Sequence, residues 1–450
     1  MELAIKIFQF ILSISILVIL HELGHFLPAK WFKTKVEKFY LFFDPWFSIA
    51  KKKIGETEYG IGWLPFGGYV KIAGMVDESM DTEQLKQPAQ PWEFRAKPAW
   101  QRLIIMMGGV TVNFFLAWII YGCLSFFNGE TTFDTAKVDA PMNYTSVAKG
   151  MGFQDGDKIL KVDGKTQNNL DKLALDVLLS DHITVLRNGK EVTFPTNDDG
   201  KAMAFRDENP KAFLTPRFPA VIDSIVNPKT VAAGLKVGDQ IVSVNQQKIN
   251  YYDELTGAIT KNPGKNINVE VLRAGAIQPL VLAVSKEGTI GVSSYKQMTK
   301  FYETKHFTFG ESIGRGFTRS IESLTYQVKQ FKLIFNKKVQ GYKKVGGPLA
   351  IIKNMPVEKA KDGSVSIDWT AFWSFTAMFS VWLAFLNLIP IPGLDGGHVI
   401  FTLYEMIFGK PVPQKVLENA QMVGVIFLLG LMLLIFGSDI FKIEYRHVMV

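Results

Sequence analysis

Four long apolar runs constrain the fold of this 450-residue chain more than any other feature. They cover residues 4–20 (with a helical pattern that continues to about 27), 103–127, 371–391 and 422–440. Each is close to the roughly 17–25 residues with which an α-helix crosses the hydrocarbon core of a bilayer. The sequence therefore predicts four membrane-spanning helices, and it excludes a disordered chain, which would contain fewer apolar residues.

The basic residues predict how these helices are oriented. Residues 28–100, between the first and second runs, contain eleven lysines and arginines, whereas the first five residues contain none. Because positive charge stays on the cytoplasmic side, we expect residues 28–100 in the cytoplasm and residues 129–370 outside it. The net charge of +8 is then mostly a topology signal, and nucleic acid is not an expected partner. A single cysteine, Cys123, excludes an intramolecular disulfide in the outer segment.

A repeat occupies the polar segment between the second and third runs. Residues 152–159 (GFQDGDKI) match residues 234–241 (GLKVGDQI) at an offset of 82, and the strand-like stretches that follow also agree. An apolar anchor, a Gly-Asp turn and a β-strand resemble bacterial PDZ domains, here two in tandem at 129–216 and 217–292. Such domains bind an extended peptide at a sheet edge and hold its terminal carboxylate with backbone N–H groups. Two β domains that act only as spacers or as a steric lid are the alternative interpretation.

Residues 311–335 carry apolar side chains at helical spacing among lysines and arginines. This pattern predicts an amphipathic helix, which is expected either on the membrane surface or against the PDZ-like domains.

The first run ends in the sequence His21-Glu22-Leu23-Gly24-His25, which is an H-E-x-x-H pattern. Residues at i and i+4 share one face of a helix, so both imidazoles can bind one Zn²⁺ while the glutamate acts beside it as a general base. Ionisable side chains inside a membrane helix are costly and are functional by default. This motif therefore predicts a catalytic zinc site within the membrane.

A third zinc ligand is expected near the end of the third run, in residues 387–398 (NLIPIPGLDGGH). Pro390 and Pro392 disfavour a regular helix, and an unwound helix at membrane depth is tolerated only beside protein or a water-filled cavity. Asp395 can therefore point a carboxylate into the bundle, and His398 is the rival ligand.

Taken together, HELGH in the first run, NLIPIPGLDGG in the third and the tandem PDZ-like repeat resemble the site-2 protease family. Within that family, the chain is similar to the bacterial regulator-of-sigma-E intramembrane metalloproteases. The resemblance covers essentially the whole chain. It implies that His21, His25 and Asp395 bind zinc and that Glu22 is the catalytic base. It also implies that Asn387 handles substrate or polarises the scissile carbonyl.

The family also has a membrane-re-entrant β-hairpin after its first helix, and residues 59–72 match that region. A hairpin edge of this kind can pair with an unwound substrate helix. One departure is Val110, at a position where the family usually has proline. The residues expected to contact substrate are Gly67, Gly68, Tyr69, Val70, Pro390 and Pro392.

The predicted fold is a membrane α-helical protein, with four transmembrane helices and a re-entrant β-hairpin, plus two extracytoplasmic β-rich PDZ domains. The expected segments are the first helix with HExxH (1–28), a cytoplasmic loop with the hairpin (29–100), the second helix (101–128), the PDZ domains (129–216 and 217–292), the amphipathic helix and linker (293–370), the third helix (371–400), and the fourth helix with the tail (401–450).

The expected function is a zinc endopeptidase of the bacterial inner membrane, with its PDZ domains in the periplasm. Its substrate would be a single-span membrane protein already trimmed by another protease, such as an anti-sigma factor or a remnant signal peptide. The expected partners are this substrate, the lipid bilayer and a peptide C-terminus at the PDZ domains. The alternative function is a membrane-anchored PDZ adaptor whose zinc site is only structural. A zinc transporter is a weaker rival, because the chain has few helices.

Overall fold

The computed structural model describes residues 1–75, 87–133, 142–166, 170–206, 213–294, 302–360 and 363–448. These residues form two compact units. The first contains residues 1–129, 306–329 and 345–450, and the second contains residues 130–305 and 330–344.

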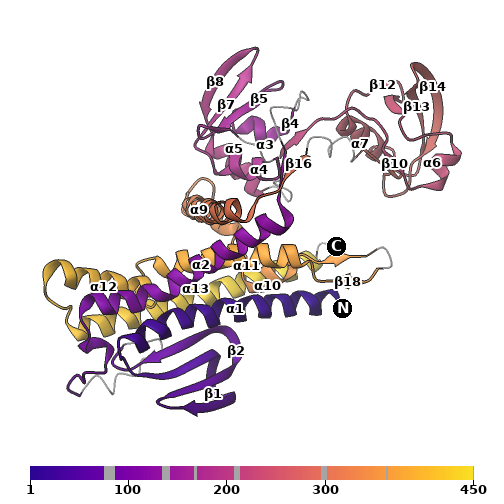
Figure 1. Cartoon of the computed structure of the whole chain (residues 1–450). Helices are drawn as coiled ribbons and strands as arrows, with labels where there is room; N and C mark the ends of the chain where they lie inside the picture. Colours follow the sequence, from indigo (N-terminus) through magenta and orange to yellow (C-terminus); the bar gives the residue numbers. More distant parts are fainter. Residues whose placement is uncertain are drawn as a thin grey trace. The chain divides into compact units, whose positions relative to one another are not determined.

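Four helices of the first unit are long and apolar enough to cross a membrane, which confirms the predicted number of spans (Figure 1). They are α1 (Glu2–Trp31), α2 (Ala99–Asn128), α11 (Trp369–Leu388) and α13 (Gln414–Val448), in which the candidate span covers Gln414–Asp439. The chain is therefore a multi-pass membrane protein. The remaining helices of this unit are α9 (Phe309–Ile334, of which residues 330–334 belong to the second unit), α10 (Pro348–Lys353) and α12 (Asp395–Phe408). Its short elements are η2 (Phe94–Ala96), β17 (Glu358–Lys359) and β18 (Val365–Ser366).

Close backbone contact joins α1 to α2. A Cβ added at Gly24 would collide with the backbone of Gly108, and one added at Gly108 would collide with that of Gly24. Small residues at a crossing let two membrane helices approach closely and gain van der Waals contacts. This approach brings the middle of α2 against the end of α1 that carries the HELGH sequence.

After α1 the chain forms a long hairpin from β1 (Val36–Ile54) and β2 (Thr57–Ile72). Strand β2 pairs with both edges of β1, because Phe39 pairs with Tyr59 on one side and with Val70 on the other. Residues 38–41 therefore lie between residues 58–61 and residues 68–71. Within the described part of the chain, β1 is the only strand paired with residues 68–71, which form an edge of this sheet.

The bounds of helix α9 are close to those of the predicted amphipathic helix. The expected neighbours were the membrane surface or the PDZ-like domains, but α9 also packs against membrane helices. The Phe317 ring packs edge-on against those of Phe114 and Trp118 on α2. The Trp118 indole N–H donates to the Ile313 carbonyl over 2.7 Å. Leu324 packs against a buried cluster contributed by α2 and α11.

The second unit contains two four-stranded antiparallel sheets with the same strand order, β6-β5-β7-β8 and β12-β11-β13-β14. Its first-half elements are β3 (Glu130–Phe133), β4 (Met142–Tyr144), α3 (Ser146–Gly150), β5 (Lys158–Val162), β6 (Lys165–Thr166), α4 (Leu170–Leu179), β7 (His182–Arg187), β8 (Lys190–Pro195), α5 (Asp198–Arg206) and β9 (Leu214–Pro216). Its second-half elements are β10 (Ser224–Ile225), α6 (Pro228–Ala232), β11 (Gln240–Val244), β12 (Gln247–Lys248), α7 (Tyr252–Thr260), β13 (Asn266–Arg273), β14 (Ala276–Ala283), β15 (Val292–Ser293) and β16 (Tyr302–Lys305). The turn η4 (Gly341–Lys344) also belongs to this unit.

The Gly-Asp repeat has the same structural basis in both copies. Asp157 accepts two hydrogen bonds from the Arg187 guanidinium, at 2.8 and 2.7 Å. Asp239 accepts two from Arg273, at 2.7 and 2.6 Å. In each copy the arginine also donates to the carbonyl of the repeat's first glycine. In each copy the aspartate and the arginine therefore hold the Gly-Asp turn against a neighbouring strand, and the aspartates have a structural role.

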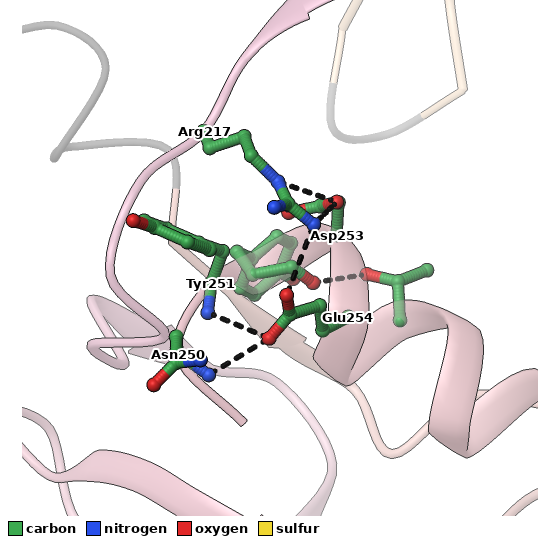
Figure 2. Close-up of polar contacts among 7 residues, drawn as sticks. Arg217, Asn250, Tyr251, Asp253 and Glu254 are labelled. Atoms are coloured by element: carbon green, nitrogen blue, oxygen red, sulfur yellow. Dashed lines mark hydrogen bonds and ion pairs between the residues drawn. The ribbon is translucent and has the colours of Figure 1, made fainter. Parts of the chain in front are cut away.

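A second ion-pair cluster lies where α7 begins (Figure 2). Arg217 donates to the carboxylates of Asp253 and Glu254, and its guanidinium lies 4.6 Å from the centre of the Tyr251 ring. Glu254 also accepts hydrogen bonds from the backbone amides of Asn250 and Tyr251. These contacts tie the first residue of the second repeat, Arg217, to the start of α7.

Candidate metal and catalytic site

The two histidines of the HELGH sequence lie one helical turn apart near the C-terminal end of α1. Their Nε2 atoms are 3.3 Å apart. Asp395, the first residue of α12, places its Oδ2 atom 3.4 Å from the His21 Nε2 and 3.3 Å from the His25 Nε2. The three side chains are mostly buried. In the described part of the chain they form a group of potential metal ligands that does not include His398.

The spacing of these three atoms fits a zinc ion. Around a tetrahedral centre with ligand distances of about 2.0–2.1 Å, neighbouring ligand atoms are about 3.3–3.4 Å apart. The observed separations are 3.3, 3.3 and 3.4 Å. The buried Asp395 Oδ2 atom has no hydrogen-bond donor among the described residues. Two imidazole nitrogens and one carboxylate oxygen are also a typical donor set for catalytic zinc, which leaves a fourth position for water.

The start of α12 explains why two glycines follow Asp395. A Cβ on Gly396 would collide with the carbonyl oxygens of Leu388 and Ile389, and one on Gly397 would lie 2.8 Å from the Ile391 oxygen. The chain folds back tightly between α11 and α12, with Gly393 at a φ of +103°. Pro390 and Pro392 lie in this turn. The break expected from the prolines is present, and a separate helix, α12, follows it.

Helix α13 supports this turn. The side chain of Gln421 accepts a hydrogen bond from the Gly393 amide over 3.1 Å. The Gly424 backbone lies directly against Pro392. The position of Asp395 therefore depends on contacts made by three helices.

Glu22 lies between the two histidines in sequence and interacts electrostatically with both of them and with Asp395. Its carboxylate accepts a hydrogen bond from the backbone amide of Val70. This contact joins the edge segment of the hairpin to the HELGH sequence. Gly68 packs directly against Val18 on α1, so Gly67, Gly68, Tyr69 and Val70 pass along the helix toward Glu22.

Asn387, in the last turn of α11, lies at the same centre. Its Nδ2 atom is 3.3 Å from the His21 Nε2. The hydroxyl of Ser380, two turns earlier on α11, donates to the Asn113 carbonyl over 2.7 Å. These contacts hold α11 and α2 together beside the histidines.

Sequence reasoning missed the contribution of α2. The Ile105 carbonyl lies 2.8 Å from the His25 Nδ1, and the Asn113 Nδ2 lies 3.2 Å from the His21 Nδ1. Between them, a Cβ on Gly109 would collide with both imidazole rings. Residues 105, 109 and 113 are four apart, so they share one face of the helix. Asn113 was visible as the one strongly polar residue of an apolar run, but nothing in the sequence indicated its partner.

An apolar cavity of about 240 Å³ lies between α2, α11 and α9. Its walls include Val110, Phe114, Leu324, Ala384 and Leu388. Val110 and Phe114 flank Asn113 on α2, and Ala384 and Leu388 flank Asn387 on α11. The cavity is therefore close to the two asparagines that contact His21.

Paired histidines on a membrane helix, a carboxylate from a second helix and a glutamate beside them define the class as a membrane-embedded metallopeptidase. Comparison with known proteins supports the same class. The chain belongs to peptidase family M50, whose family model matches residues 9–431. Membership in this zinc-dependent family makes the protein a zinc metalloprotease.

Three relatives match over nearly their whole length. A putative zinc metalloprotease of Vibrio cholerae is 28% identical, with 96% of this chain and 97% of the relative covered. The regulator of sigma-E protease RseP of Escherichia coli is 28% identical, with 96% and 97% covered. The regulator of sigma E protease of Haemophilus influenzae is 26% identical, with 97% and 98% covered.

Proposed function

We propose that this metalloprotease hydrolyses a peptide bond within the transmembrane segment of a single-span membrane protein. The observation that carries the proposal is the convergence of His21, His25 and Asp395 beside Glu22 within a bundle of membrane-spanning helices. The helices around the site are apolar, as a transmembrane segment of a substrate is. A soluble substrate would not need a site among helices of this kind. The names of the two sigma-E relatives suggest an anti-sigma factor as this substrate. A remnant signal peptide is the other proposed substrate, and trimming beforehand by another protease is part of the proposal.

In this proposal, His21, His25 and Asp395 hold the zinc ion. When bound, zinc polarises the scissile carbonyl and makes a water molecule acidic enough to attack at neutral pH. Glu22 accepts the proton of the attacking water at its carboxylate and then delivers it to the leaving amide nitrogen. Asn387, with its amide beside His21, donates a hydrogen bond to the substrate carbonyl and orients it. His398 has no part in this ligand set.

A substrate helix must unwind before its backbone can be cut, and in lipid the freed N–H and C=O groups need new partners. We assign this role to the β1–β2 hairpin, as a membrane-re-entrant element. Among the described residues, 68–71 form an edge of the hairpin sheet with no second strand paired to it, and the Val70 amide contacts Glu22, so a substrate strand added there would pass the catalytic carboxylate. In this proposal, Pro390 and Pro392, in the turn before Asp395, border the opposite side of the unwound substrate segment.

The apolar cavity beside Asn387 would receive one side chain of the substrate. An engineered apolar cavity of about 150 Å³ is known to bind benzene, so a cavity of about 240 Å³ is large enough for an aromatic or branched aliphatic side chain. Such side chains are the commonest in a transmembrane substrate.

The two repeats at 129–216 and 217–292 are proposed as PDZ domains on the periplasmic side of the bacterial inner membrane. Their matching sheets and Asp–Arg contacts support a common fold. In the second repeat, Arg217 is already paired with two carboxylates. A peptide C-terminus would therefore be held by backbone N–H groups, unless the domains act only as a filter against untrimmed substrates. The proposed partners are the lipid bilayer and the substrate, and nucleic acid is not among them.

Replacing Glu22 with glutamine tests the proposed function directly. The purified variant and the wild type are compared on a trimmed single-span substrate in liposomes. Because a general base contributes about 10²–10⁴-fold, we expect cleavage to fall by that factor while zinc content stays stoichiometric. Cleavage at the wild-type rate would exclude the mechanism. A wild-type protein that retains zinc but cuts no substrate would favour the adaptor function.

A further inference from the structure

Asn113 is a fully buried polar side chain in the middle of a membrane-spanning helix. Its Nδ2 atom faces the His21 Nδ1 at 3.2 Å. Its Oδ1 atom is buried and has no hydrogen-bond donor among the described residues. A buried acceptor without a donor costs about 1–3 kcal/mol, so this arrangement needs a physical reason.

The reason follows from the chemistry of the histidine ring. The His21 Nε2 points toward the His25 Nε2 and the Asp395 Oδ2, the side on which the metal is proposed to bind. A ring nitrogen that binds a metal carries no proton, so in a neutral imidazole the proton must lie on Nδ1. The group opposite the His21 Nδ1 must then be an acceptor, and an amide NH₂ is a donor.

A half-turn of the Asn113 amide removes this conflict. The oxygen and nitrogen of an amide are nearly the same size, and their assignment follows from the hydrogen-bond network. Turning the amide brings Oδ1 to the His21 Nδ1 and pairs the buried acceptor with the ring N–H. The other histidine shows the same pattern, because its Nδ1 lies 2.8 Å from the Ile105 carbonyl, which can only accept.

We propose that Asn113 is a positioning residue that accepts a hydrogen bond from the His21 Nδ1–H and so fixes the ring for metal binding. The proposal rests on the proposed metal-binding role of His21. Helix α2 then orients both histidines, with a backbone carbonyl at position 105 and a side-chain oxygen at position 113. Partners of this kind fix the tautomer and raise the basicity of the ligand, and their loss typically lowers metal affinity about 10–100-fold.

The test compares zinc dissociation constants, measured by competition with a chelator, for purified full-length variants. Asn113→Leu keeps the approximate volume and removes the acceptor, so we expect zinc to bind about 10–100-fold more weakly. Asn113→Asp retains an acceptor and has no donor, so it is expected to bind zinc at least as tightly as wild type. Ser125→Ala removes another buried polar group of α2, about 18 Å along the helix, and should leave zinc binding unchanged.

The melting temperature of the metal-free variants shows whether each has folded. Wild-type zinc affinity in a folded Asn113→Leu variant would overturn the proposal. So would an Asn113→Asp variant as weak as Asn113→Leu, because the amide would then act as a donor. His21→Ala separates this inference from the proposed function. If His21→Ala keeps wild-type zinc affinity, the metal site itself is wrong and Asn113 has no ligand to position.

Discussion

Gly109 faces both histidines, and we predict that Gly109→Ala disables the zinc site. The added Cβ would lie 2.5 Å from the His21 Cε1 and 2.7 Å from the His21 Nδ1, and closer still to the His25 Nε2. Carbon atoms in favourable contact are about 3.5–4.0 Å apart, so the rings must move by about 1 Å. The rings have little room to move, because the Ile105 carbonyl and Asn113 contact their Nδ1 atoms.

The size of the effect follows from the tolerance of a metal site. Ligand distances in such sites are matched to within about 0.2 Å, whereas the steric conflict requires a shift several times larger. We therefore expect zinc affinity to fall at least about 100-fold, the upper end of what is typical for losing an orienting partner. Proteolysis of a single-span substrate should be lost in proportion.

The assay is zinc content and chelator competition on detergent-purified protein, with cleavage measured on the same samples. Gly430→Ala on α13 is a matched control, because a Cβ there has no atom within 4 Å. That variant should keep zinc and activity, since alanine is a better helix former than glycine. A Gly109→Ala protein that binds zinc as tightly as Gly430→Ala would refute the site geometry described here.

Three further predictions concern other parts of the molecule. Burial would raise the pKa of Asp239, but hydrogen bonds from Arg273 and from the Lys236 amide lower this pKa overall. The ionised Asp239 carboxylate therefore stabilises the fold fully above about pH 4, and this stabilisation is lost as the pH falls through the lowered pKa. Asp239→Asn should therefore destabilise the second repeat by about 2 kcal/mol at pH 7, measured by hydrogen exchange in β11 and β13, and equal protection in the two proteins at pH 7 would contradict this. Val70→Pro removes the amide that contacts Glu22 and interrupts the sheet edge, so cleavage should fall sharply while zinc content stays at the level of a Val70→Ile control; loss of zinc together with activity would instead indicate a collapsed site. Ala384→Phe fills part of the apolar cavity, so it should lower kcat/KM more for substrates with large side chains near the cut than for substrates with alanine there, and a uniform decrease would exclude the cavity as a substrate pocket.

The sequence was sufficient for the features that have a strong local pattern. Apolar runs of spanning length predicted the four membrane helices, and all four are present. The HELGH spacing placed His21 and His25 on one helix face, and the prolines before Asp395 predicted a break in the chain where α11 ends at Leu388. The repeat at an offset of 82 predicted two similar β-rich domains, and the strand order of the two sheets agrees.

Features that depend on contacts between distant segments were not predictable. A separate helix α12 was not predicted, because residues 395–400 were assigned to the third helix and residues 401–408 to the segment of the fourth. The tight contacts of Gly396 and Gly397 with the end of α11 could not be read from the sequence. The amphipathic pattern of α9 indicated an apolar face but not its partner, which includes α2. Asn113 and Gly109 lie within an apolar run of the sequence. Their contacts with the two histidines are visible only in the structure, where α2 crosses α1.

The proposed reaction is the cleavage of a peptide bond inside a membrane-spanning segment. The most direct measurement is mass spectrometry of the products from a trimmed single-span substrate, incubated in liposomes with zinc-loaded wild-type protein or with the Glu22→Gln variant. We expect new termini within the apolar segment for the wild type and none for the variant. Termini confined to the flanking polar residues, or identical products with both proteins, would contradict this proposal.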